Sequence, residues 1–148
     1  MSQVNASPRE IRVEMPATLE NIDAADAQVC RLLADADAPI DRFAVRILLR
    51  EALLNAVIHG NAEDRNRSVH VRAGLDEFGL TLTVRDEGPG FCWRDVEGNL
   101  DLATDSGRGI PLMRIYASKV TFNEAGNQVT LFRSYSQQAQ SAAQGGAA

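Results

Sequence analysis

An amphipathic segment over residues 42–59 constrains the fold more than any other feature of this sequence. Its apolar residues recur at helical spacing, and Asp41 directly before it is a candidate N-cap. Gly60 follows the segment and is typical of a helix stop. The pattern therefore predicts one long helix with an apolar face and a polar face.

Period-two alternation of apolar and polar residues predicts short strands before and after this helix. Five strands are expected, at residues 10–15, 68–75, 80–85, 119–123 and 128–135, with hairpin turns at 76–79 and 125–127. Helical spacing predicts two further helices. The first covers residues 21–36 with Asn21 as its N-cap, and the second covers residues 111–117 with Pro111 in its first turn.

Length, charge and cysteine content limit the class of protein. Residues 1–135 of the 148 are expected to form one compact domain, and residues 136–148 a disordered tail of low complexity. Fifteen Lys and Arg against 20 Asp and Glu give a net charge of −5, which disfavours binding to nucleic acids or anionic membranes. No apolar run approaches the roughly 20 residues of a membrane span. Cys30 and Cys92 form no C-x-x-C pair, which favours a reducing compartment and predicts a cytoplasmic protein.

The basic residues exclude several classes of enzyme. Lys119 is the only lysine, so the chain contains neither a P-loop nor the lysine that follows the glycine-rich loop of the usual protein kinase. The only histidines are His59 and His70, and no H-E-x-x-H motif is present, which disfavours a zinc protease. Any nucleotide chemistry must therefore use another scaffold.

Three motifs carry candidate chemistry, and the first lies on the long helix. Glu51, Asn55 and His59 follow one another at intervals of four residues, so they share one helix face with a rise of about 6 Å per step. A carboxylate and an amide oxygen in this arrangement suit the activation of a hydroxyl or water and the binding of Mg²⁺. The same spacing also fits an ordinary solvated stripe.

The second and third motifs are rich in glycine. In D-E-G-P-G-F at 86–91 an acid at a strand end suits a hydrogen bond from an exocyclic amine, and Gly88 and Gly90 let the backbone approach a flat ligand. In S-G-R-G-I-P at 106–111 glycines lead into a helix N-terminus that favours phosphate, and Arg108 adds a donor fork. Taken singly, each motif also fits an ordinary turn or loop.

In this order the three motifs resemble those of a known superfamily. E-A-L-L-N-A-V-I-H-G-N is similar to the N box, D-E-G-P-G-F to the first glycine box and S-G-R-G-I-P-L-M to the second glycine box of the Bergerat-type ATP-binding domain. Histidine kinases, type II topoisomerases and the heat-shock chaperone ATPase share this domain. The short chain and the form of its N box resemble the anti-sigma-factor serine kinases of bacterial partner-switching systems. The resemblance covers about residues 9–135 and implies an α/β (α+β) fold of two layers, with a mixed, mostly antiparallel sheet covered on one face by helices.

The resemblance also implies a role for each matching residue. Asn55 would coordinate a Mg²⁺ ion that bridges the phosphates of ATP, Glu51 would be the general base, and Asp86 would bind the adenine amine. Further ATP contacts would come from Gly88, Gly90, Gly107, Gly109 and Thr130. Arg108 is the candidate for stabilising the transferred phosphoryl group because this loop contains no lysine. His59 and Asn61 have no role that the sequence reveals.

The activity implied is that of a serine kinase that uses Mg-ATP. Its substrate would be a small STAS-type antagonist of the anti-sigma factor, its other partner a sigma factor or equivalent client, and it would form a homodimer. One alternative is an ATP-binding module that sequesters a partner without phosphotransfer, although Glu51 beside Asn55 favours chemistry. A second alternative is the detached catalytic domain of a histidine kinase, which usually has a longer lid between its glycine boxes.

Overall fold

The computed structural model describes residues 9–62, 64–93 and 109–136. Its elements in chain order are β1 (Glu10–Pro16), α1 (Glu20–Asp35), α2 (Arg42–Leu54), the π-helix η1 (Asn55–Gly60), β2 (Ser68–Leu75), β3 (Gly79–Arg85), α4 (Ile110–Tyr116), β4 (Lys119–Phe122) and β5 (Gln128–Ser134). All five strands expected from the alternation are present, and each end lies within one residue of its predicted position. The two hairpin turns are also confirmed, since β2 pairs with β3 and β4 with β5.

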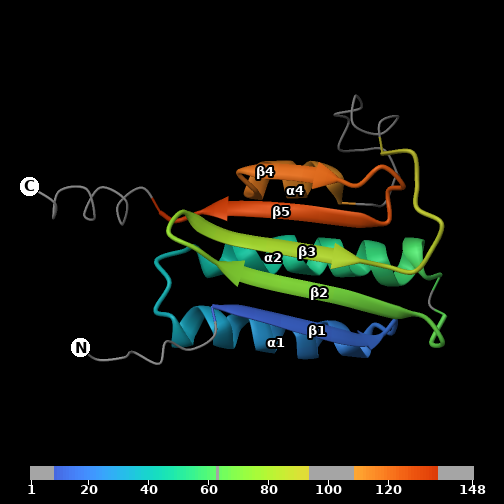
Figure 1. The fold of residues 1–148 in the computed structure, drawn as a ribbon, viewed down its shortest axis with the longest axis horizontal. Coiled ribbons are helices and arrows are strands. Elements are labelled where there is room, and N and C mark those ends of the chain that lie inside the picture. Colours follow the sequence, from blue (N-terminus) through green and yellow to red (C-terminus); the bar gives the residue numbers. More distant parts are fainter. Residues whose placement is uncertain (1–8, 63, 94–108, 137–148) are drawn as a thin grey trace, which may run out of the picture.

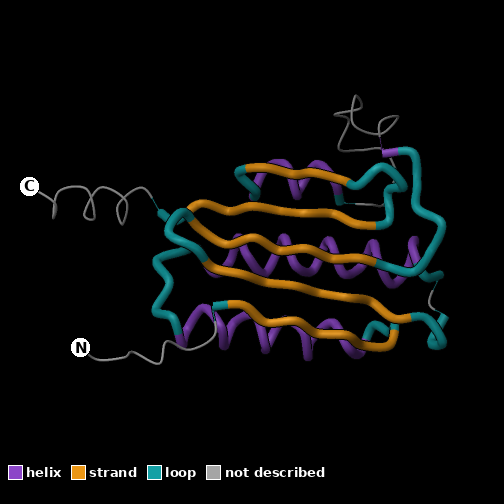
Figure 2. Tube along the Cα trace, in the orientation of Figure 1, coloured by secondary structure: helices purple, strands orange, loops and turns teal. Residues whose placement is uncertain are grey.

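The strands form one open sheet in the order β1-β2-β3-β5-β4, and its four pairings are all antiparallel. In Figures 1 and 2 the helices lie on the same side of this sheet, with α1 behind β1, α2 behind β2 and β3, and α4 behind β4. The α+β sandwich of two layers that the sequence predicts is therefore confirmed. It is the architecture expected of a Bergerat-type domain.

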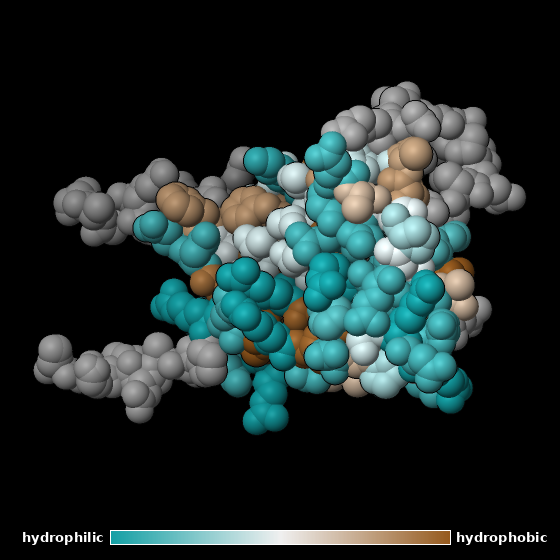
Figure 3. Space-filling view, turned by 45° about the vertical axis from the view of Figure 1, so that its right-hand side comes forward, coloured by the Kyte–Doolittle hydropathy of each residue, from teal (hydrophilic) through white to brown (hydrophobic). Residues whose placement is uncertain are grey.

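The hydrophobic core lies between the sheet and the helices. Side chains alternate along a strand, so Val71 and Leu82 point toward the helices and are buried, whereas Arg72 and Thr83 lie on the open face. Figure 3 shows mostly hydrophilic side chains over the part of this open face that it presents. The residues that α2 buries against the sheet and its neighbours are Ala44, Val45, Leu48, Leu49, Ala52 and Leu53.

The N-terminus of α2 is capped as the sequence predicts, but that of α1 is not. The Asp41 carboxylate accepts hydrogen bonds from the backbone N–H groups of Phe43 and Ala44, at 3.0 and 3.2 Å. The prediction of Asn21 as an N-cap is wrong, because α1 begins at Glu20 and the amide of Asn21 donates instead to the Pro16 carbonyl at 3.0 Å. Asn21 thus ties the end of β1 to the first turn of α1.

The long helix changes its winding near its end. The sequence predicts one α-helix to residue 59, but the α-helix ends at Leu54 and the next six residues form η1. The N–H of Asn61 donates to the carbonyl of Ala56 at 2.8 Å, five positions back, which is the hydrogen bond of a π turn. His59, in the last turn of η1, is exposed, whereas Glu51 and Asn55 are half-buried.

Two further expectations from the sequence concern membrane spans and the C-terminal tail. Within the described residues, no helix has the length and apolar composition needed to cross a membrane. The tail expected at 136–148 lies outside the described residues from residue 137 onward. The last described residue, Ser136, donates its N–H to the carbonyl of Pro39 at 2.9 Å, which joins the end of the sheet to the α1–α2 connection.

Replacement of the α2 cap provides a test of this fold. Asp41→Ala leaves two N–H groups of the first turn without their acceptor, so the free energy of unfolding should fall by about 0.5–2 kcal/mol. Urea unfolding followed by circular dichroism measures the change, and Asp41→Asn, which keeps a capping oxygen, is the control. Equal unfolding midpoints for the wild type and Asp41→Ala would contradict the assigned cap.

Candidate functional site

Elements far apart in the sequence meet at one end of the sandwich. The end of α2, the beginning of η1, the segment after β3 and the β4–β5 turn surround a hollow between the helices and the sheet. The residues that line it are Ala52, Asn55, Ala56, Val84, Asp86, Phe91, Phe122, Gly126, Asn127, Gln128 and Val129. The hollow thus combines apolar and aromatic walls with a single carboxylate, that of Asp86, as is typical of small-molecule sites.

Hydrogen bonds and close packing restrict the position of Asp86. It is 8% exposed, its backbone N–H donates to the carbonyl of Asn127 at 2.9 Å, and its Oδ1 accepts the N–H of Gly88 at 2.8 Å. A methyl group at Gly60 would overlap the Asp86 carboxylate, and one at Gly88 would overlap the Gly60 carbonyl. The absence of a side chain at both glycines is therefore what allows the helix end to contact the acid.

Asn61 is a residue of this site that the sequence did not reveal. Its side chain is fully buried, its Oδ1 accepts the N–H of Glu87 at 2.9 Å, and its Nδ2 donates to the Ser68 carbonyl at 3.0 Å. The position of an asparagine directly after the H-G pair at the helix end was the available signal. Its hydrogen-bond partners could not be inferred, because only the folded sheet brings Glu87, which follows β3, and Ser68, at the start of β2, beside it.

Glu87, whose N–H bonds to Asn61, also contacts β2 through its side chain. Its carboxylate accepts the N–H of Ser68 at 2.8 Å and lies 3.2 Å from Nε2 of His70. The Ser68 N–H, and to a smaller extent His70, lower the pKa of the Glu87 carboxyl below its usual value. The carboxylate next to Asp86 in the chain is thus directed at β2, away from the hollow.

The first glycine box packs against the β4–β5 turn. Gly90 has φ +83° and Gly126 has φ +80°, a backbone region that favours glycine. A methyl group at Gly90 would overlap the carbonyl of Ala125, and one at Gly126 the backbone of Phe91. The turn itself is held by Asn123, whose Oδ1 accepts backbone N–H groups from Gly126, Asn127 and Gln128.

An aromatic cluster borders the hollow. Phe91 and Phe122 line it and meet edge to face with ring centroids 5.4 Å apart, while Trp93 stacks on Phe122 at 5.7 Å. Local sequence patterns do not reveal this cluster, because Phe122 comes from β4 and only the sheet order brings it beside Phe91. The rings give one wall of the hollow an apolar surface.

Gly109, the first described residue of the second glycine box, lies beside the polar face of α2. Gly109 has φ +63° and precedes the first turn of α4, and a methyl group there would overlap the carboxylate of Glu51. Glu51 and Asn55 are both half-buried and lie one turn apart. Gly107 and Arg108, the other candidates in this motif, lie outside the described residues.

One predicted contact must be corrected. Thr130 does not line the hollow that contains Asp86; it lies on the open face of the sheet, where its Oγ1 is 3.5 Å from that of Thr83. The reason is the alternation of β5, which turns Val129 toward the helices and the neighbouring Thr130 away from them. Asn127 and Gln128, just before it in the chain, line the hollow instead.

The arrangement offers contacts for a nucleotide. A flat base with an exocyclic amine would find an acceptor in Asp86 and apolar walls around it. The described residues contain no cluster of three or more His, Cys, Asp or Glu side chains that could hold a metal ion. Asn55 lines the hollow and carries an amide oxygen.

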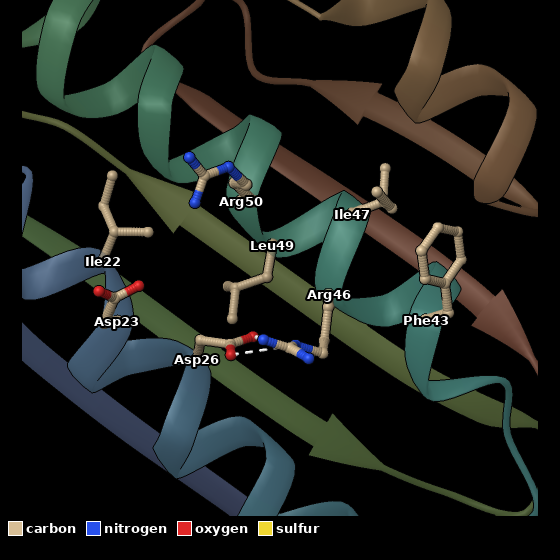
Figure 4. A pocket seen from close by; sticks show the side chains of 8 residues that line it. All are labelled: Ile22, Asp23, Asp26, Phe43, Arg46, Ile47, Leu49 and Arg50. Atoms are coloured by element: carbon tan, nitrogen blue, oxygen red, sulfur yellow. Dashed lines mark hydrogen bonds and ion pairs between the residues drawn. The ribbon is translucent and has the colours of Figure 1, made fainter.

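A second groove lies on the outer side of the helix layer, between α1 and α2. Figure 4 shows its lining side chains, among them Asp26 and Arg46, which form an ion pair at 3.1 Å. It contains none of the residues that the three motifs single out. The candidate site is therefore the hollow around Asp86.

Comparison with known proteins supports this assignment. Residues 15–133 match the family described as the histidine kinase-like ATPase domain. The chain is 30% identical over 128 residues to the anti-sigma F factor of Geobacillus thermodenitrificans, covering 82% of this chain and 87% of the relative. It is 28% identical to that of Bacillus velezensis and 27% identical to that of Bacillus subtilis, in both cases over 131 residues that cover 84% of this chain and 89% of the relative. The chain therefore belongs to the histidine kinase-like ATPase domain family and, within it, to the anti-sigma-factor kinase family.

Proposed function

We propose that this protein is a serine kinase that uses Mg-ATP and acts as an anti-sigma factor in a partner-switching system. Its substrate is a small STAS-type antagonist protein, which it phosphorylates on serine. The observation that carries the proposal is the contact between the Glu51 carboxylate and Gly109. It sets a candidate base against the start of α4, where the second glycine box leads into the helix.

ATP recognition is divided between two parts of the site. The Asp86 carboxylate accepts a hydrogen bond from the exocyclic amine of adenine, and the backbone at Gly88 and Gly90 shapes the space beside the base. Asn55 holds Mg²⁺ through its side-chain oxygen, and the bound ion neutralises charge on the phosphates. Asn55 and Asp86 come from different elements and line the same hollow, which supports this division.

Phosphotransfer then requires a base and a stabilised phosphoryl group. Glu51 accepts the proton of the substrate serine hydroxyl, the serine oxygen forms a bond to the γ-phosphorus, and the bond to the β–γ bridging oxygen breaks to leave ADP. Arg108, which lies outside the described residues, is proposed from the sequence to stabilise the transferred group. Positioning and charge neutralisation supply most of the rate enhancement.

Partner exchange follows from the chemistry of the product. The relatives are named anti-sigma F factors, and by analogy this protein binds a sigma factor or equivalent client until the antagonist displaces it. A phosphoserine placed in the antagonist interface adds charge that weakens the complex. We further propose that the protein works as a homodimer in the cytoplasm and binds neither nucleic acid nor membranes; its net charge of −5 agrees with the last point.

The role of Glu51 is tested with an isosteric substitution. Glu51→Gln keeps the shape that fits beside Gly109 but cannot accept a proton, so phosphoserine formation should fall by about 10²–10⁴-fold while ATP still binds. The measurement is transfer of label from γ-labelled ATP with Mg²⁺ into a cytosolic extract of the source organism, and titration calorimetry measures ATP binding.

The outcomes separate the alternatives. Equal labelling by the wild type and Glu51→Gln would remove Glu51 from the chemistry. ATP binding by the wild type without labelling of any protein would favour a binding module, and acid-labile phosphohistidine would favour a histidine kinase domain.

The contact between Gly60 and Asp86 gives a second test. In Gly60→Ala the added methyl group would overlap the Asp86 carboxylate and displace it, so the affinity for ATP should fall tenfold or more, about 1.4 kcal/mol. Gly74→Ala is the matched control, because a methyl group there meets its nearest neighbour at an ordinary 3.7 Å. Unchanged ATP affinity in a folded Gly60→Ala protein would show that Asp86 does not contact the nucleotide.

A further inference from the structure

Two polar residues are buried in the described part of the chain, and they lie at the same place in the fold. Asn61 is 0% exposed and Asp86 is 8% exposed. Asp86 is the proposed hydrogen-bond acceptor for the amine of the base, whereas no step of the proposed reaction uses Asn61. Burial of an amide side chain costs free energy unless its polar atoms form hydrogen bonds. The hydrogen-bond partners of Asn61 therefore indicate which segments of the chain it holds in place.

Those contacts form a closed ring of hydrogen bonds. Asn61 accepts the N–H of Glu87 and donates to the carbonyl of Ser68, while the N–H of Ser68 donates to the carboxylate of Glu87. The ring joins the end of η1, the start of β2 and the residue that follows Asp86. The backbone of Asn61 is fixed as well, since its own N–H bonds to Ala56 in the π turn.

The ring limits the freedom of Asp86. On one side of Asp86 its own N–H bonds to the carbonyl of Asn127, and on the other the N–H of Glu87 bonds to Asn61. The peptide groups before and after the acid are therefore both anchored. Rotation of this short segment, which would turn the carboxylate away from the hollow, requires one of the two anchors to break.

We propose that Asn61 is a positioning residue that directs the Asp86 carboxylate toward the base and so sets the preference for a purine with an exocyclic amine. This inference rests on the proposed function, because it assumes that Asp86 meets the base of ATP. Asn61 is not among the described residues that line the hollow, and it acts through the N–H of Glu87.

The test compares two nucleotides that differ in a single group. Titration calorimetry on the full chain with Mg²⁺ gives the affinity for ATP and for purine riboside triphosphate, which lacks the 6-amino group. The wild type should prefer ATP about tenfold or more, the scale of a hydrogen bond to a charged acceptor. In Asn61→Ala this preference should fall to about twofold or less, mainly through weaker binding of ATP. Asn66→Ala is the control, because Asn66 is an exposed asparagine in the same connection.

A conservative variant distinguishes positioning from simple loss of stability. Asn61→Asp keeps an oxygen acceptor for the Glu87 N–H but loses the donor to Ser68, so it should retain most of the preference for ATP even if it unfolds at a lower temperature. If Asn61→Ala does not fold, Asn61→Asp alone decides, and loss of the preference in that folded variant would overturn the inference.

The calorimetric result differs according to whether the positioning role of Asn61 or ATP binding through Asp86 is wrong. A wild-type preference that survives in Asn61→Ala would overturn the positioning role and leave ATP binding through Asp86 intact. Equal affinity of the wild type for both nucleotides would overturn the role of Asp86 and, with it, this inference.

Discussion

The close approach of Gly60 to the Asp86 carboxylate is the contact on which the candidate site depends. It joins the end of the long helix to the end of β3, and neither Gly60 nor Gly88 has room for a side chain there. The π turn of η1 brings the helix end to this point, and π turns of this kind occur frequently at functional sites. The N box and the first glycine box thereby form one structural unit, although a strand hairpin separates them in the sequence.

Burial of α2 determines where the reactive side chains lie. Its apolar side packs into the core, so Glu51 on its polar side is held against the start of α4, and Asn55, the first residue of η1, is held at the hollow. Side chains on a helix fixed in this way are positioned more precisely than side chains on a loop. The two residues proposed to act at the phosphates, Glu51 and Asn55, thus lie on one helical segment, whereas Asp86, proposed to bind the base, follows β3.

The hollow lies at one end of the sandwich. Among the described residues that line it, only Gln128 also borders the open face of the sheet, and none lines the groove between α1 and α2. A kinase that also sequesters a client needs surface beyond its catalytic residues. In the proposed switch, a phosphate on the antagonist would change which partner is bound through charge and desolvation.

The sequence by itself determined the types of the elements and the order of the motifs. Strand alternation, the Asp41 cap and the glycine boxes are local patterns, and local backbone preferences produce the same elements in the folded chain. It did not determine the partners of Asn61, the π turn after Leu54 or the face on which Thr130 lies. These three features depend on which strands become neighbours and in what register. A hydrogen bond needs both its donor and its acceptor in place, and a buried face needs the surface that covers it. The tertiary structure alone decided them, and with them the surroundings of Asp86.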